Sequence, residues 1–273
     1  MANLFRAFLF KLRRDLTFKI TLFIGLGFAV LMTVIYLFID NFLADSFGSS
    51  GVKLCTGQGL FLNSLSPVQN FGISIPVNLI SFTILEFNQG IIRNKIIAGN
   101  SKFKIYVGLF LSGLVFTILV LMAYALLCLG LGSIFGGFDI NGIAMVGLGA
   151  GKSSPEFFWK VVGSTLLLYV CITSMTIFFS TLFRSIGPTI PCVILILFGL
   201  YFASTIIMMF DTSVTDTFVL FNPFNPVVCS TIGESGALVF DNKPFIASLI
   251  NNSVYAVLFF VAGSILFVKR DIK

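Results

Sequence analysis

Six long apolar stretches, separated by polar segments, constrain the fold of this chain more than any other feature of its sequence. The stretches cover about residues 20–39, 71–87, 105–130, 158–183, 189–210 and 245–268. Each is close to the ~20 residues with which an α-helix crosses the hydrocarbon core of a bilayer. They are continuous, whereas a membrane β-barrel shows shorter segments of alternating polarity, so six transmembrane helices are expected. The second stretch is the least regular, because Pro76 and Asn78 interrupt it.

The composition agrees with a membrane location. Hydrophobic residues make up 57% of the 273 residues, and charged residues make up only 10%. A soluble fold of this length cannot enclose so much apolar surface in a core. The segments outside the stretches are too short for an independent soluble domain. The sequence therefore predicts an all-α integral membrane protein in which residues 1–273 form a single transmembrane domain.

The distribution of Lys and Arg predicts the orientation in the membrane. Most of the 17 basic residues lie near the two termini and between the second and third stretches. Cytoplasmic segments of membrane proteins carry an excess of Lys and Arg, so both termini are expected in the cytoplasm. The net charge of +6 is then explained by topology. No nucleic-acid partner is needed to account for it.

Residues 1–19 are predicted to form an amphipathic helix in the membrane interface, in contact with the lipid bilayer. One side of the helical wheel is apolar, and the segment also carries the basic residues Arg6, Lys11, Arg13 and Arg14. This combination is typical of helices that lie along a membrane surface. Phe10 and Asp15 depart from the pattern. The alternative is a positively charged anchor without a defined helix.

A charged segment connects the second and third stretches. Residues 88–98 contain no Pro and are followed by Gly99 and Asn100, so they are expected to form a short cytoplasmic helix. Such a helix is longer than a simple connection requires, which suggests a surface for a partner. Glu86 stands just before it. This carboxylate either stabilises the positive end of the following helix or has a functional role at membrane depth.

The outer segments contain two features that a structure can test. Cys55 and Cys229 are the cysteines outside the stretches, and on an oxidising side they can form a disulfide or stay as two thiols. Residues 218–229 are apolar but shorter than a span, so they are expected to form a re-entrant or surface-lying element, with a plain loop as the alternative. The chain has no His and no paired-Cys spacing, so no metal site is expected.

Catalysis by this chain is not expected. Residues 147–153 resemble a phosphate-binding loop, but the position that requires the first glycine is Val146, and no strand is expected before it. The stretches offer Ser and Thr without His or paired carboxylates, so no catalytic residues can be named. No cofactor-binding residue is assigned to this chain either.

Several segments together resemble the ABC-2 type permeases of ATP-binding cassette transporters, and most closely the bacterial bacitracin-resistance and lantibiotic-immunity group. The most specific segment is Glu86 followed by Gly90-Ile-Ile-Arg-Asn-Lys-Ile-Ile-Ala-Gly99-Asn-Ser-Lys102. The six stretches, the basic N-terminal segment, the outer Asn222-Pro-Phe-Asn-Pro226 and the closing residues 267–273 also fit this pattern. The resemblance covers nearly the whole chain, although the first outer segment, residues 40–70, is longer than in the smallest relatives.

The resemblance implies a permease subunit in the bacterial cytoplasmic membrane. Such permeases pair with a second permease, identical or homologous, and each binds a cytoplasmic ABC ATPase subunit that holds ATP and Mg. The coupling helix would be residues 88–98, and the coupling residues would be Glu86, Gly90, Arg93, Asn94, Lys95 and Gly99. The implied activity is export of a lipophilic or amphipathic substrate, such as an antimicrobial peptide or a drug-like molecule. The alternatives are a gradient-driven secondary transporter or channel, and a membrane sensor or scaffold without transport.

Overall fold

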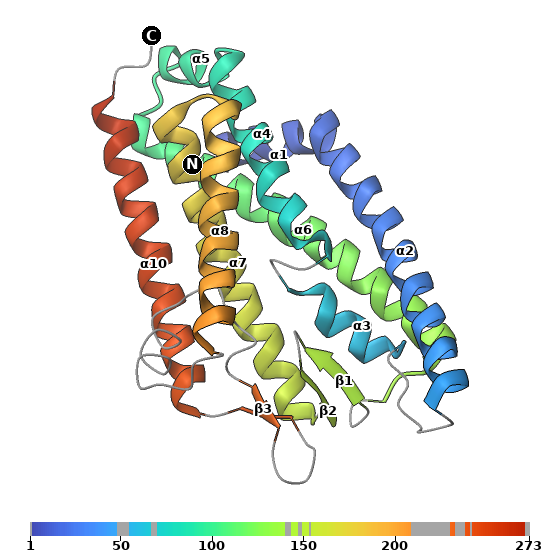
Figure 1. The fold of residues 1–273 in the computed structure, drawn as a ribbon. Coiled ribbons are helices and arrows are strands. Elements are labelled where there is room, and N and C mark those ends of the chain that lie inside the picture. Colours follow the sequence, from blue (N-terminus) through green and yellow to red (C-terminus); the bar gives the residue numbers. More distant parts are fainter. Residues whose placement is uncertain are drawn as a thin grey trace.

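A computed structural model describes residues 2–47, 55–66, 70–139, 143–146, 149–152, 154–208, 230–232, 238–240 and 242–270. Figure 1 shows long helices that run along one another as a bundle. Among the described residues, six helical segments are long and apolar enough to cross a membrane: Leu16–Phe42, Phe71–Asn88, Lys102–Gly136, Pro155–Phe183, Ile186–Ala203 and Phe245–Lys269. The six predicted spans are thereby confirmed, with ends that move by a few residues. The protein is a multi-pass membrane protein built of helices.

The N-terminal segment forms two helices instead of one continuous rod. Helix α1 spans Ala2–Arg14 and packs on α6, while α2 spans Leu16–Phe47. Asp15 separates them because its carboxylate accepts a hydrogen bond from the backbone N–H of Thr17 at 2.7 Å, which caps the start of α2. The predicted interfacial helix of residues 1–19 therefore ends earlier, at Arg14. The departure of Asp15 from the apolar pattern is explained by this capping role.

A tight double turn follows the second membrane helix. The short 3₁₀ helix η1 (Asn70–Ile73) leads into α4 (Ser74–Asn88), which is followed by α5 (Ile91–Ile97) and α6 (Lys102–Gly136). Gly90 and Gly99 on either side of α5 have φ of +67° and +83°. These are left-handed conformations that glycine adopts without a steric penalty. The connecting helix predicted over residues 88–98 is thus confirmed in kind and shortened at both ends.

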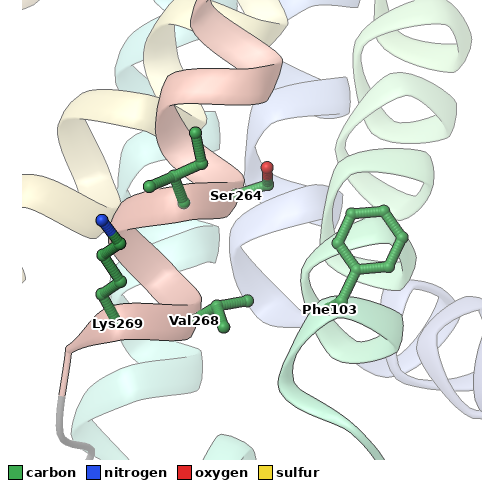
Figure 2. A pocket seen from close by; sticks show the side chains of 5 residues that line it. Phe103, Ser264, Val268 and Lys269 are labelled. Atoms are coloured by element: carbon green, nitrogen blue, oxygen red, sulfur yellow. The ribbon is translucent and has the colours of Figure 1, made fainter.

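Three helices complete the bundle. Helix α7 spans Pro155–Phe183, α8 spans Ile186–Met208, and α10 spans Asn242–Lys269 and packs along α7. The Ser154 hydroxyl caps α7 by accepting from the N–H of Phe157 at 3.2 Å, with Pro155 in the first turn. A hollow lies between the start of α6 and the end of α10, where Phe103 faces Ser264 and Val268 (Figure 2).

The two ends of the bundle differ in structure. Helices α1 and α5 and the last turn of α10 lie together at one end, hereafter the α5 end, because Lys11 bonds Glu86 and Lys102 bonds the carbonyl oxygen of Val268. The two described chain ends are therefore on the same side, as the charge pattern predicts. The cytoplasmic assignment of that side stays a prediction.

Two small hairpins lie at the opposite end of the bundle (Figure 1). Strand β1 (Ile143–Val146) pairs antiparallel with β2 (Gly149–Lys152), and β3 (Ser230–Ile232) pairs antiparallel with β4 (Leu238–Phe240). The prediction of an all-α fold therefore omits these short strands in the outer segments. Strand β1 ends directly before the segment that resembles a phosphate-binding loop, so the expectation of no preceding strand is wrong, and β2 takes up part of that segment. The predicted re-entrant element, residues 218–229, lies outside the described residues.

The first segment predicted to lie on the outer side contains a buried helix that was not predicted from the sequence. Helix α3 spans Gly57–Ser64, and all eight of its residues are buried. It packs closely on the last turns of α6, where a Cβ added to Gly132 would lie 2.9 Å from the Cα of Gly57. Thr56 caps its start, and Phe61 stacks on Phe158 of α7 with 5.4 Å between ring centroids. This segment is therefore part of the bundle and not a surface loop.

The buried side chain of Gln58 in α3 leads us to predict a substitution that stabilises the protein. Its side chain is 0% exposed, and neither its amide nitrogen nor its amide oxygen has a hydrogen-bond partner among the residues that the structure describes. A buried amide without partners costs about 1–3 kcal/mol, and leucine has a similar size without polar atoms. We expect Gln58→Leu to raise the free energy of unfolding by about that amount. Thermal unfolding in detergent measures the effect.

The matched control for this prediction is Gln89→Leu. Gln89 is exposed after the end of α4, so its amide is solvated and the same substitution should leave the unfolding temperature unchanged. A lower unfolding temperature for Gln58→Leu would contradict the prediction, because it would mean that the amide contributes favourable contacts at its buried position.

Candidate functional site

Helix α5 has one buried face and one exposed face. Ile92 is 1% exposed and belongs to an apolar cluster with Phe8 of α1, Tyr106 of α6 and Phe267 of α10. On the other face, Arg93 and Asn94 are exposed and the side chain of Ile97 is 74% exposed. The helix thus contributes to an apolar cluster that it shares with three other helices, while it presents a mixed polar and apolar surface at the end of the bundle.

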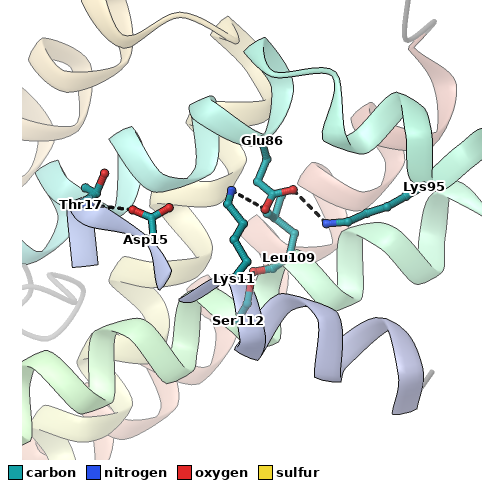
Figure 3. A network of polar contacts seen from close by, with 7 residues as sticks. All are labelled: Lys11, Asp15, Thr17, Glu86, Lys95, Leu109 and Ser112. Atoms are coloured by element: carbon teal, nitrogen blue, oxygen red, sulfur yellow. Dashed lines mark hydrogen bonds and ion pairs between the residues drawn. The ribbon is translucent and has the colours of Figure 1, made fainter. Parts of the chain in front are cut away.

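A buried carboxylate holds this end together. Glu86 lies near the end of α4 and is 0% exposed. Its Oε1 accepts a hydrogen bond from Nζ of Lys11 at 2.6 Å, and its Oε2 accepts one from Nζ of Lys95 at 2.9 Å. Figure 3 shows the two lysines approaching the carboxylate from different helices. One side chain therefore ties α1, α4 and α5 to one another; these three residues are called the Glu86 cluster below.

Two aromatic rings also lie close to the ammonium groups of the Glu86 cluster. Nζ of Lys95 lies 3.3 Å from the ring centroid of Phe8, and Nζ of Lys11 lies 5.0 Å from that of Phe82. Two ammonium groups share one carboxylate, and the negative faces of the rings supply further attraction. Burial lowers the pKa of Lys95, and the attraction of Glu86 opposes that shift.

The structure distributes the predicted coupling residues between two environments. Arg93 and Asn94 are exposed on α5, and Gly90 and Gly99 shape the turns around it. Lys95 instead points into the protein toward Glu86, so it is not part of the exposed face. The carboxylate of Glu86 serves the two lysines and lies within α4, so its interpretation as a charge at the start of the next helix is replaced by the ion-paired role.

The basic residues of the N-terminal helix divide in the same way. Arg6, Arg13 and Arg14 are exposed along α1, and the Arg14 guanidinium lies 4.4 Å from the ring centroid of Phe10. Lys11 is half-buried and paired with Glu86. The sequence analysis missed this pairing, because it joins residues 75 positions apart. The signal that was available is an acidic residue at the end of an apolar stretch, which requires a basic partner when it is buried.

Cys55 lies at the opposite end of the bundle. It forms no disulfide with the cysteines that the structure describes, it is 1% exposed, and its backbone N–H donates to Oδ2 of Asp40 at 2.7 Å. Burial raises the pKa of this thiol, and the negative charge of Asp40 adds to the shift. Cys229 lies outside the described residues, so the disulfide between Cys55 and Cys229 stays a prediction.

The described residues hold no group of three or more metal-ligating side chains from His, Cys, Asp and Glu. Comparison of the chain with models of known protein families finds no match, and comparison with curated proteins finds none. The α5 end presents a contact surface formed by the exposed side chains of Arg93, Asn94 and Ile97. Beneath this surface, the Glu86 cluster and Ile92 fix α5 to the bundle.

Proposed function

We propose that this chain is the permease subunit of an ATP-driven exporter of the ABC-2 type. The observation that supports this proposal best is the two-faced α5 at the end of a six-helix membrane protein. Its outer face combines Arg93 and Asn94 with Ile97, an apolar residue 74% exposed at the polar end of the bundle. Exposed apolar side chains among polar ones are typical of protein contact surfaces. A cytoplasmic ATPase subunit is the proposed partner.

The contacts beneath α5 give the proposed coupling a physical route. A partner that moves α5 pulls on Lys95 and hence on Glu86, which is bonded to Lys11 of α1 and is part of α4. It also moves Ile92, which belongs to the same apolar cluster as Phe267 near the end of α10. One displacement therefore reaches several membrane helices at once. ATP binding and hydrolysis in the partner would then bias the bundle between two arrangements.

The proposal includes the setting of the transporter. The chain resides in the bacterial cytoplasmic membrane with α5 inside, beside a second permease copy or a homologous permease. ATP and Mg are held by the partner ATPase and not by this chain. The apolar character of the spans, each with at most two charged residues in its most apolar window, supports a lipophilic or amphipathic cargo such as an antimicrobial peptide.

Co-purification tests the proposal. The detergent-solubilised protein is isolated from its native host beside the variant Arg93→Glu with Ile97→Glu, which reverses a charge and removes the apolar contact on the exposed face of α5. We expect an ATPase to be recovered in comparable amount with the unaltered protein, and at least about tenfold less with the variant, since interface anchors contribute more than about 1.4 kcal/mol. Mass spectrometry of the bound proteins measures both.

Lys104→Glu is the matched control. Lys104 is exposed in the first turn of α6 at the same end of the bundle, but it is not part of α5. Its charge reversal should leave ATPase recovery unchanged. Recovery that survives the α5 variant would show that the partner binds elsewhere, and the absence of any ATPase under mild conditions would favour a gradient-driven transporter or a scaffold.

A further inference from the structure

Two hollows flank the last turns of α10 at the α5 end. The first has a volume of about 240 Å³ and lies between α10 and the start of α6, and the second has a volume of about 460 Å³ and lies between α10 and the end of α7. Lys269 lines both hollows, as the last residue of α10. The two hollows are called the α10 grooves below.

The α10 grooves are apolar along their walls. The first is lined by Phe103, Ile265 and Val268, and the second by Leu182, Phe183 and Leu266. Ser264 also borders the first groove (Figure 2), but its hydroxyl donates to the carbonyl oxygen of Val261 at 2.8 Å and so offers little polarity. All of these residues belong to membrane-length helical segments. The walls therefore suit hydrocarbon chains and not a soluble polar ligand.

Lys102 and Arg270 hold the end of α10 by hydrogen bonds, whereas the ammonium group of Lys269 can bind a ligand. Nζ of Lys102 donates to the carbonyl oxygens of Val268 and Arg270, at 3.2 Å each. Nη1 of Arg270 donates to the carbonyl oxygen of Leu182 at 2.5 Å. The ammonium group of Lys269 makes no hydrogen bond or ion pair with any described residue. Because it ends a membrane-length helix, it lies at the depth of lipid headgroups.

The charge around the α10 grooves selects the kind of lipid. Lys102, Lys269 and Arg270 gather here, since Lys269 and Arg270 line the grooves and Lys102 bonds the carbonyl oxygens of Val268 and Arg270. The acidic side chains described at this end are already engaged, since Glu86 bonds two lysines and Asp15 caps α2; Asp271 lies outside the described residues. A basic group between transmembrane helices attracts anionic lipid headgroups. We propose that the α10 grooves bind an anionic phospholipid, with its phosphodiester at Lys269 and its acyl chains along the apolar walls.

Native mass spectrometry of the full-length protein tests the site. The protein is freed of lipid by detergent exchange and titrated with phosphatidylglycerol or with phosphatidylcholine that has the same acyl chains. We expect phosphatidylglycerol to bind more tightly. Lys269→Gln should weaken its binding about fivefold, the contribution of one basic residue near an anionic headgroup. Lys269→Arg should retain it, because the charge is kept.

Two further variants distinguish a specific lipid site from general attraction of anionic lipids to a basic protein. Arg13→Gln removes an exposed charge from α1 that lines neither of the α10 grooves, and should leave binding unchanged. Ile265→Trp fills the first groove at an exposed position and should weaken binding of both lipids. Equal affinity for the two lipids, equal losses in Arg13→Gln and Lys269→Gln, or full binding by Ile265→Trp would each overturn the proposal. The lipid site does not depend on the proposed transport function, because this test involves no ATPase.

Discussion

Replacing Glu86 with Gln is expected to lower the free energy of unfolding by about 3–5 kcal/mol, the cost of removing one partner from a buried ion pair. The amide keeps the shape of the side chain but leaves Lys11 and Lys95 without their counter-ion, and both lysines are largely buried. Because the Glu86 cluster joins α1, α4 and α5, the loss should loosen the whole α5 end. Thermal unfolding in detergent measures the change.

The control for this prediction uses a second carboxylate that pairs with lysine. Glu156 is 75% exposed and lies 2.6 Å from Nζ of Lys160 one helical turn away. Exposed pairs contribute little, so Glu156→Gln should leave the unfolding temperature unchanged. Adding Lys95→Met to Glu86→Gln should recover part of the stability, since one uncompensated ammonium group is then absent. Equal effects of Glu86→Gln and Glu156→Gln would show that the buried pairing does not stabilise the fold.

The second large effect is expected for Gly136→Ala at the end of α6. A Cβ at this position would overlap the carbonyl oxygen of Cys55 and lie 2.6 Å from its carbonyl carbon. These are backbone atoms at the start of the segment that leads into α3, so they cannot turn aside as a flexible side chain does. We expect the added methyl group to displace α3 from the bundle and to cost about 3 kcal/mol, the upper part of the range for overpacked cores.

The displacement has a chemical readout besides stability. In protein kept under reducing conditions until labelling, Cys55 should react slowly with maleimide, because it is almost fully buried and burial raises its thiol pKa. In Gly136→Ala its labelling, followed by mass spectrometry of the peptide that contains Cys55, should become much faster. Gly130→Ala is the control, since a Cβ there meets nothing within 4 Å and alanine favours the helix. Slow labelling of Cys55 in Gly136→Ala would show that α3 stays in place.

The six membrane helices could be predicted from the sequence because hydrophobic length is a local property. A stretch such as residues 105–130 must satisfy its own backbone hydrogen bonds in lipid, whatever its neighbours are. The cap of α7 by Ser154, with Pro155 in the first turn, is a local property of the same kind, since capping depends on adjacent residues. The end of α5 before Gly99 followed from the same local rules, whereas its start did not, because residues 88–90 were expected to be helical and the helix begins after Gly90.

The candidate site was predictable in part. The exposed positions of Arg93 and Asn94 match the expectation of a surface on α5, whereas Lys95 turns inward because a buried Glu86 is available to it. Nothing in the spacing of Lys11 and Glu86 predicts their contact, since it requires α1 to lie across the end of α4. The two short hairpins were missed because their strands contain only three or four residues, too few for a pattern of alternation.

The sequence by itself thus determined that this protein lies in a membrane, how many membrane helices it has and where its connecting helix lies. Each of these depends on hydrophobicity and capping within one segment. Only the tertiary structure decided that residues 57–64 enter the bundle as α3, since that depends on glycines of α6 allowing close backbone contact. It also decided that one carboxylate binds two lysines from separate helices. Such contacts join distant parts of the chain. Their free energy depends on how deeply the groups are buried, and burial cannot be read from any one segment.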